Sequence, residues 1–438
     1  MKTWLGTGLL AALAAVAGCG SEGGGGDDNT TGTAPTDAVT YWQDAKPILD
    51  AKCNGCHTPG GIAPFSLETY DKAYQMREMI KSSTKAGTMP PWPAAKGCSD
   101  YLSDRSLTDA QIETLAAWSD GGGVEGDPAK PGAPIDRGPT NDLSRVDLSL
   151  EMPVEYTPTK EPDDYRCFVV DWPEAETQYV AGFRANPGNP AVVHHVIAYL
   201  VEPGKVADVE AADAAEAGPG YTCYGGPGVQ SSWLGAWAPG SLGTDTPAGT
   251  GIRVEPGSKV VLQVHYNTLT AGMQSDRTTV DFRLEKSVAT EGKIQPWAKP
   301  TWLSGNGMLI PAGESDVMHS FGYDITGIGG DPGPITIHSA GLHMHTLGTH
   351  GVLRIDRADG TSECMLDIPK WDFHWQGSYS FLEPKTVNPG DKVYLECHWD
   401  NSAANQPLID GVKMPPKDVT WGEGTTDEMC LGTFYITR

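Results

Sequence analysis

Beyond its first eighteen residues, the sequence lacks any apolar run long enough to cross a bilayer, so no membrane-spanning helix is expected. It is also poor in basic residues, since 31 Lys and Arg face 56 Asp and Glu and give a net charge of −25. That balance argues against nucleic acid and anionic membrane surfaces as partners. The chain is rich instead in Gly (54) and Pro (34), which favours strands and turns over long helices.

The N-terminal segment contains the one long apolar run of the sequence. Residues 1–18 carry one positive charge, an apolar core and small residues before Cys19, which is the pattern of a secretory signal peptide. The end of this segment, Val16-Ala-Gly-Cys19, resembles the bacterial lipoprotein signal and implies a lipidated Cys19; an ordinary signal peptide with a chance cysteine is the alternative. We expect an exported chain with a polar tether over residues 19–40. Because Gly20 follows Cys19, the expected location is the outer membrane, facing the periplasm or the cell surface.

The remaining chain is too long for one ordinary hydrophobic core, and its residue patterns divide it into segments. Residues 41–125 have helical periodicity, as in Leu107 to Trp118, where Thr108 or Asp109 is the expected N-cap. A Pro- and Gly-rich linker follows at residues 126–145. From residue 146 onward, short alternating strands between turns predict two antiparallel β-sandwiches, at residues 146–295 and 296–438. The expected fold class is mainly β, with two tandem jelly-roll-like sandwiches preceded by a small α-helical module. Individual predicted elements include a helix at 67–81 and strands at 260–266, 280–284, 335–337, 352–355 and 393–399.

The helical module contains Cys53-Asn-Gly-Cys56-His57, the attachment pattern of a c-type heme. The two thiols can add to the heme vinyl groups, and His57 then lies beneath the iron. A disulfide or a chance match is the alternative. We expect Met89, on a Pro-stiffened loop, as the second axial ligand, because a thioether opposite histidine suits electron transfer. The module is therefore predicted to be a cytochrome c-like domain with one covalently bound heme c.

Histidines in the β region form three groups: His194-His195, His265, and His343-Met-His345. Residues i and i+2 of a strand point to the same face, so His343 and His345 can share one metal ion. Each group also has an ordinary structural interpretation, since single strand histidines and buried methionines are common in cores. Spacing alone therefore does not identify the metal.

The order of these groups resembles the copper type II, ascorbate-dependent monooxygenases, the family of dopamine β-monooxygenase and peptidylglycine hydroxylating monooxygenase. The resemblance covers about residues 146 to 438. The cytochrome-like stretch from Cys53 to Gly123 resembles the domain found ahead of bacterial members. The motifs that carry the resemblance are, in order, Tyr165-Arg-Cys167, His194-His195, Tyr221-Thr-Cys223, Trp237-Ala-Pro-Gly, Leu262-Gln-Val-His-Tyr266, His343-Met-His345-Thr-Leu-Gly348, Cys397 and Glu428-Met-Cys430.

The resemblance implies two copper ions with different ligand sets. The electron-transfer copper would be held by His194, His195 and His265. The oxygen-binding, catalytic copper would be held by His343, His345 and Met429, where a soft thioether favours Cu(I). In the family the two coppers face each other across an open cleft.

The resemblance also implies the disulfides Cys167–Cys223 and Cys397–Cys430. It assigns no partner to Cys98 or Cys364. These two could pair with each other or remain free.

Two positions depart from the peptide-processing member of the family. That enzyme has an arginine, which holds its substrate's carboxylate, where this chain has Gly341, and a tyrosine where this chain has Thr433. A peptide ending in glycine is therefore in doubt as substrate.

The expected function is a copper-dependent monooxygenase that hydroxylates a C–H bond of a small organic substrate with O2. Its electrons would come from an ascorbate-like reductant or a redox protein and pass through the heme. A non-catalytic copper and heme electron-transfer or copper-handling lipoprotein is the alternative. A zinc hydrolase that uses the three-histidine site is a weaker one.

Overall fold

The computed structural model describes residues 38–59, 61, 63–239, 241–269, 271–304, 307–327, 332–409 and 412–438. The predicted signal peptide, Cys19 and most of the predicted tether lie outside these residues. None of the helices in the described part combines the length and the apolar character needed to cross a membrane.

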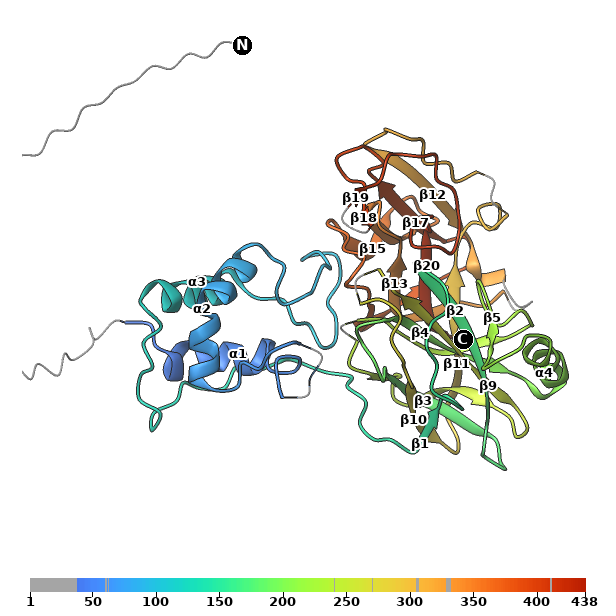
Figure 1. Cartoon of the computed structure of the whole chain (residues 1–438), viewed down its shortest axis with the longest axis horizontal. Helices are drawn as coiled ribbons and strands as arrows, with labels where there is room; N and C mark the ends of the chain where they lie inside the picture. Colours follow the sequence, from blue (N-terminus) through green and yellow to red (C-terminus); the bar gives the residue numbers. More distant parts are fainter. Residues whose placement is uncertain are drawn as a thin grey trace, which may run out of the picture. The chain divides into compact units, whose positions relative to one another are not determined.

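The first helices in the described part of the chain pack around a core of their own (Figure 1). A π-helical turn at Tyr41–Ala45 continues into α1 (Lys46–Lys52), which is followed by α2 (Tyr70–Lys85) and α3 (Asp109–Asp120). Helix α3 begins where the sequence predicts, because Thr108 and Gln111 form a reciprocal capping box. Helix α2 begins later than Leu67, since the Leu67 amide donates instead to the carbonyl of His57.

The next strands form two antiparallel layers around a shared apolar core that includes Phe168, Val196, Leu262 and Phe282. The alternation of apolar residues along these strands buries one face of each layer against the other. One layer contains β1 (Leu148–Glu151), β10 (Thr279–Glu285), β3 (Gln178–Asn186), β8 (Thr250–Val254) and the short β7 (Thr244–Asp245). The other contains β6 (Ser232–Trp237), β4 (Val193–Val201), β9 (Lys259–Asn267), β2 (Asp163–Asp171) and β5 (Tyr221–Thr222).

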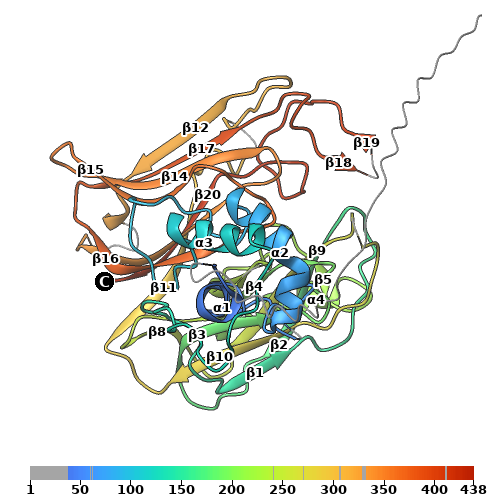
Figure 2. The ribbon, with the colours of Figure 1, turned by 90° about the vertical axis from the view of Figure 1, so that its left-hand side faces the viewer.

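The last third of the chain forms a second pair of layers around Ile337, Leu353, Leu395 and Phe434. The inner layer contains β16 (Ser378–Val387), β13 (Ile335–His343), β20 (Leu431–Thr437) and β11 (Thr290–Trp297). The outer layer contains β12 (Val317–Tyr323), β17 (Lys392–Trp399), β14 (Gly348–Asp356) and β15 (Ser362–Ile368) (Figure 2). The short strands β18 (Leu408–Ile409) and β19 (Val412–Lys413) pair with each other. The prediction of a mainly β fold with sandwich-like sheets is confirmed.

Strand β11 belongs to both sandwiches. Its residues 292–297 pair with β20, Ile294 also pairs with Trp233 of β6, and Thr290 pairs with Thr250 of β8. The boundary predicted between residues 295 and 296 falls within this strand. The two sandwiches therefore share main-chain hydrogen bonds rather than a free linker.

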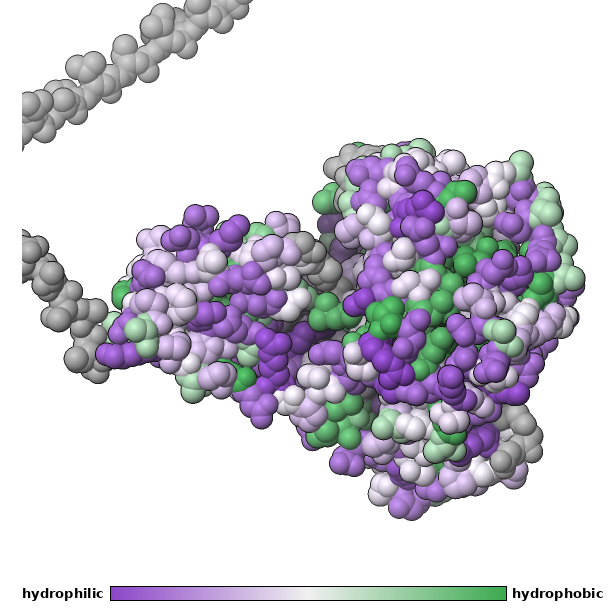
Figure 3. Space-filling view, turned by 90° about the horizontal axis from the view of Figure 1, so that it is seen from below, coloured by the Kyte–Doolittle hydropathy of each residue, from purple (hydrophilic) through white to green (hydrophobic). Residues whose placement is uncertain are grey.

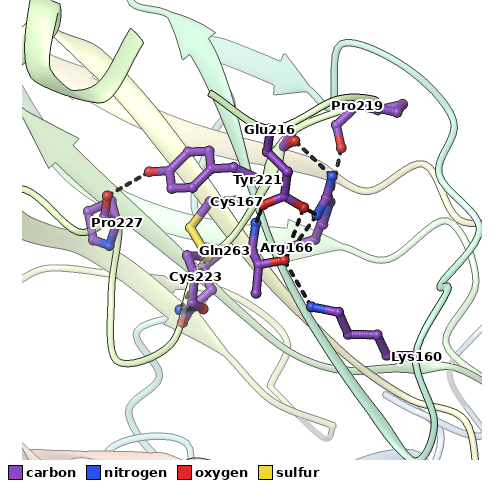
Figure 4. The surroundings of a disulfide bond; sticks show 11 residues. Lys160, Arg166, Cys167, Glu216, Pro219, Tyr221, Cys223, Pro227 and Gln263 are labelled. Atoms are coloured by element: carbon purple, nitrogen blue, oxygen red, sulfur yellow. Dashed lines mark hydrogen bonds and ion pairs between the residues drawn. A yellow bond between two sulfur atoms is a disulfide. The ribbon is translucent and has the colours of Figure 1, made fainter. Parts of the chain in front are cut away.

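Helix α4 (Val206–Ala214), which the sequence analysis did not predict, packs the buried Val209 against the disulfide Cys167–Cys223. Beside this disulfide the buried Arg166 forms an ion pair with Glu216 and donates to the carbonyls of Pro219 and Gly220 at 3.0 and 2.8 Å (Figure 4). These contacts fix the loop that follows α4. The second disulfide implied by the resemblance, Cys397–Cys430, also forms.

The structure decides the alternative that was open for Cys98 and Cys364, which form a third disulfide. Main-chain bonds surround it, since Ala95 donates to Asp367 at 2.8 Å and Leu102 donates to Ser380 at 2.8 Å. The segment between α2 and α3 is thus fastened to strands β15 and β16.

Candidate metal centres

Three histidines converge on neighbouring strands of the first sandwich. His194 and His195 lie on β4, and His195 pairs in register with His265 of β9. The register shifts between Val193 and His195, and this bulge lets two adjacent side chains turn toward one place. One ring nitrogen from each histidine lies within 4.8 Å of the others. The structure thus brings together all three residues that the sequence analysis selected for one site.

The chemistry of this cluster fits a metal ion. Both ring nitrogens of His194 are buried and have no hydrogen-bond partner among the described residues. Burial lowers the pKa of His194 and His195 well below the usual value, so both imidazoles are neutral and offer lone pairs. His265 bonds the Asp163 carboxylate through Nε2 at 2.9 Å, which leaves its Nδ1 facing the other two rings. Three neutral imidazoles form a set that copper accepts in either oxidation state.

A second group lies at one end of β13. His343 is the last residue of this strand, and its ring centre lies 5.0 Å from that of His345. Nδ1 of His343 bonds the Gln376 side chain and Nδ1 of His345 bonds the Asp427 carbonyl at 3.1 Å, so both Nε2 atoms remain for a metal. Burial lowers their pKa values to about 4 and about 3. Both residues and Met429 line one cavity.

The prediction that His343 and His345 share a strand is wrong in one respect, because β13 ends at His343. The fully buried Glu428 explains the break. Its carboxylate accepts hydrogen bonds from the amides of His345 at 2.8 Å and Leu347 at 2.6 Å, and from Nε1 of Trp399 at 2.9 Å. These amides are therefore withdrawn from the sheet, and a bonded loop rather than strand periodicity orients His345.

The two groups of histidines lie side by side. The ring centres of His195 and His343 are 6.3 Å apart. Phe373 stacks on His194 at 4.3 Å and meets the edge of His345 at 6.0 Å. The two groups of histidines therefore adjoin each other, and the ring of Phe373 contacts both.

A cavity of about 330 Å³ opens beside both groups. Among the described lining residues Glu423 is the one carboxylic acid, and burial raises its pKa, which favours the neutral form. Leu303, another lining residue, is one of the exposed apolar side chains. Figure 3 shows hydrophobic patches among hydrophilic residues on one face of the chain. The described lining includes no Lys or Arg; its apolar members include Ile197, Trp233, Trp237, Leu342, Trp421 and Leu431.

Gly341 and Thr433, the two departures seen in the sequence, are neighbours in this cavity. They pair in register between β13 and β20. A Cβ atom at residue 341 would lie 2.7 Å from Oγ1 of Thr433 and 3.2 Å from the carbonyl oxygen of Gly377. The packing therefore leaves no room for a side chain where the peptide enzyme has its arginine.

In the helical module, Cys53 and Cys56 are free and half-buried on the turn after α1. Nδ1 of His57 lies 3.1 Å from the Phe65 carbonyl, which leaves its Nε2 available. Met89 is half-buried in the loop after α2.

Both sandwiches match known families of domains. Residues 148–272 match "Copper type II ascorbate-dependent monooxygenase, N-terminal domain", and residues 305–437 match the C-terminal domain of the same enzymes. The chain belongs to the copper type II ascorbate-dependent monooxygenase family. It is a copper-dependent monooxygenase, and its family binds two copper ions and uses an organic substrate, O2 and an ascorbate-type reductant. The helical module lies outside both matched ranges.

Other comparisons add little to this. No curated protein matches the chain. Similar solved structures include a putative secreted protein from Parabacteroides distasonis, with 8% identity and a TM-score of 0.15, covering 66% of this chain and 88% of that one. Broad bean stain virus has 11% identity and a TM-score of 0.21, covering 63% and 76%. Bacillus subtilis oxalate decarboxylase has 7% identity and a TM-score of 0.12, covering 67% and 98%. These scores support no argument about fold or function.

Several residues of the site could not be recognised from the sequence. Asp163, Phe373 and Gln376 contact the histidines from distant parts of the chain, and no local pattern marks them. Glu428 was noted only as part of the Glu-Met-Cys motif. The one signal in the sequence for its structural role was its position beside Met429, just before a stretch with the pattern of a buried strand.

Proposed function

We propose that this monooxygenase hydroxylates a C–H bond of an uncharged, apolar or aromatic small molecule that binds in the 330 Å³ cavity. The single observation that carries the proposal is that this cavity is lined by His343, His345 and Met429 yet by no described Lys or Arg. The balanced reaction takes R–H, O2, two electrons and two protons to R–OH and water.

The ligand sets are proposed as the resemblance implies. His194, His195 and His265 hold the electron-transfer copper, and His343, His345 and Met429 hold the catalytic one. Copper bound at these residues would supply the one-electron redox chemistry with O2 that carbon hydroxylation requires.

Other residues orient the ligands and shape the cavity. Glu428 fixes the His345 loop and Gln376 orients the His343 ring. The indole rings of Trp233 and Trp237 keep water from the apolar part of the cavity. The hydroxyl group of Thr433, beside Gly341, is placed to bond a polar group of the substrate.

We further propose that the helical module carries a heme c at Cys53, Cys56 and His57, with Met89 as the second axial ligand. The unpaired thiols and the free Nε2 of His57 support this assignment. A heme bound there would supply one-electron transfer at a high potential.

The proposed electron route from an external donor leads through this module to the copper sites. A cavity of about 210 Å³ is lined by both Cys56 and Gln376, the residue that bonds His343. Trp92, three residues after Met89, lies 5.1 Å from Tyr379, ring centre to ring centre. The shared cavity and the contact between Trp92 and Tyr379 support this route.

Replacing Met429 by Ile tests the catalytic assignment. Product formation should be lost, because the thioether ligand disappears, while the heme absorption spectrum and the copper at the three-histidine site persist. If turnover survives, Met429 is not a ligand of the catalytic copper. Product formed in proportion to the O2 consumed separates the enzyme from a copper-handling protein, and activity with zinc alone would point to a hydrolase.

Metal analysis tests the cofactors. Two coppers and one iron per chain are expected, with the iron in a heme that stays attached after denaturation. A Cys53→Ala variant serves as the control, and it should lose this attachment while it retains both coppers.

Export and the lipid on Cys19 are also proposed. Mass spectrometry of the mature N-terminus should find an acylated cysteine.

A further inference from the structure

A buried tyrosine without a hydrogen-bond partner lines the cavity beside the catalytic histidines. Three alternate residues of β4, His195, Ile197 and Tyr199, line this cavity, as expected for one face of a strand. Tyr199 is 4% exposed, and its hydroxyl group forms no hydrogen bond among the described residues. Because buried tyrosine hydroxyls ordinarily have a partner, this one is available to a bound molecule.

The carboxyl group of Glu423 and the hydroxyl group of Tyr199 flank the same loop of the cavity wall. A Cβ atom at Gly225 would lie 3.3 Å from Oε1 of Glu423, and a Cβ atom at Gly226 would lie 3.7 Å from the Tyr199 hydroxyl oxygen. Burial raises the pKa of Tyr199, and the charge of Glu423 raises it further, as expected for two groups that lie close together. Since neither glycine has a side chain, this loop covers neither oxygen.

This pair of oxygens suits a neutral hydroxyl group better than a charged group. A hydroxyl both donates and accepts, so it can accept from Tyr199 while it donates to an oxygen of Glu423. Burial raises the pKa of Glu423, although a bond from the Gly225 amide partly opposes this effect. The raised pKa disfavours the carboxylate that an ammonium ion requires. The described lining also contains no Lys or Arg that could hold an anion.

We propose that Tyr199 and Glu423 bind a hydroxyl group of the substrate, so that the enzyme acts on an apolar or aromatic alcohol. The inference rests on the proposed function, because the pair shares its cavity with the residues assigned to the catalytic copper. It narrows the substrate class to molecules that are held at a hydroxyl group and oxidised at a C–H bond elsewhere. A mostly apolar pocket with a few polar groups that fix orientation is the usual construction of a small-molecule site.

Binding of two probes of nearly equal shape tests the pair. Benzyl alcohol has a hydroxyl group where ethylbenzene has a methyl group. Equilibrium dialysis of the copper-loaded chain without reductant measures both affinities while no turnover occurs. Benzyl alcohol should bind about 10-fold more tightly than ethylbenzene, which is the effect of one or two neutral hydrogen bonds.

Tyr199→Phe should abolish this preference by weakening only the binding of benzyl alcohol. Its melting temperature should not fall, because the hydroxyl group has no partner among the described residues. Tyr221→Phe is the matched control. The Tyr221 hydroxyl bonds the Pro227 carbonyl at 2.7 Å and is buried away from the cavity, so this variant should lose stability and keep the preference (Figure 4).

Two changes at Glu423 test its role in the pair. Glu423→Gln keeps a neutral group that donates and accepts, and it should retain most of the preference for benzyl alcohol. Glu423→Met has a similar length without these groups and should lose it. Loss of the preference in Glu423→Gln would show that the site needs an ionised carboxylate, and this would overturn the proposal.

Equal affinities of the two probes for the parent chain would also overturn the proposal, as would an unchanged preference in Tyr199→Phe. These outcomes are distinct from a failure of the proposed function. Met429→Ile should keep the preference for benzyl alcohol, because binding needs no turnover, while product formation is lost. If Met429→Ile stays active and the preference still depends on Tyr199, the catalytic assignment fails and the hydroxyl-binding pair stands.

Discussion

The imidazole rings of His195 and His343 lie 6.3 Å apart although they belong to different sandwiches. A shared hydrogen-bond network accompanies this proximity. Asp163 accepts hydrogen bonds from His265 at 2.9 Å and from the amide and hydroxyl of Thr425 at 3.0 and 2.6 Å. Thr425 is in the loop that leads to Met429, so one carboxylate orients both metal sites.

Replacing Asp163 by Asn should weaken copper binding at the three-histidine site by about 10- to 100-fold, because His265 loses the carboxylate that fixes its ring. Competition with a copper chelator measures the affinity. Asp171→Asn, a change on the same strand at an exposed ion pair with Lys259, is the control and should bind copper normally. Equal losses in the two variants would show that Asp163 acts only on stability.

Replacing Glu428 by Gln should lower the free energy of unfolding by about 3 kcal/mol, since the new amide group faces backbone N–H donors that it cannot satisfy. The affinity of the His343 and His345 site for copper should fall with it. Denaturant unfolding and copper titration provide the two measurements. Glu202→Gln, at an exposed position, should leave both unchanged. A variant as stable as the parent would contradict the role assigned to Glu428.

Replacing Gly341 by Ala should destabilise the chain by about 1–3 kcal/mol, because the added Cβ would lie 2.7 Å from Oγ1 of Thr433. Thr433→Ala in the same chain should recover part of this loss, whereas Thr433→Ser should not, since serine keeps the oxygen. A double-mutant cycle on melting curves measures the coupling. If the changes in unfolding free energy of the two single variants simply added in the double variant, residues 341 and 433 would not be in steric contact.

Replacing Asp391 by Asn should destabilise the chain more at pH 7 than at pH 3. Burial alone would raise the pKa of Asp391, but bonds from the amides of Asn388 and Ala358 and from Arg357 outweigh it and lower the pKa. A carboxyl whose folded pKa is depressed contributes stability above its unfolded pKa of about 3.9 and loses it as pH falls through the folded value.

The expected loss for Asp391→Asn at neutral pH is about 2 kcal/mol, measured by denaturant unfolding at both pH values. The exposed change Glu176→Gln serves as control and should show no such pH dependence. If Asp391→Asn destabilised the chain more at pH 3 than at pH 7, the Asp391 carboxylate would not be the stabilising form.

Local patterns predicted much of the fold. Alternating residues located β9 and β17 to within about one residue at each end, and the Thr108 cap located the start of α3. The resemblance supplied two cysteine pairs that the structure forms. These features depend on hydrogen bonds between close neighbours or on motifs that stand together in the sequence.

What the sequence did not show depends on contacts between distant residues. The bond from Thr425 to Asp163 joins positions 262 residues apart, and no periodicity carries that information. His345 was assigned to a strand because the buried carboxylate of Glu428, which removes its amide from the sheet, lies 83 positions away. The pairing of Cys98 with Cys364 was left open for the same reason, since their separation is 266 residues.

Strand β11 sets a limit on how the enzyme can move. Its antiparallel pairing with β20 runs from Gly292 opposite Thr437 to Trp297 opposite Gly432. A hinge that separated the two sandwiches here would have to break either this ladder or the pairing of β11 with β6 and β8, and so expose backbone amides to water. Substrate and product should therefore enter and leave by rearrangement of side chains and loops around the cavity, and a chain split within β11 should yield neither half as a stable protein.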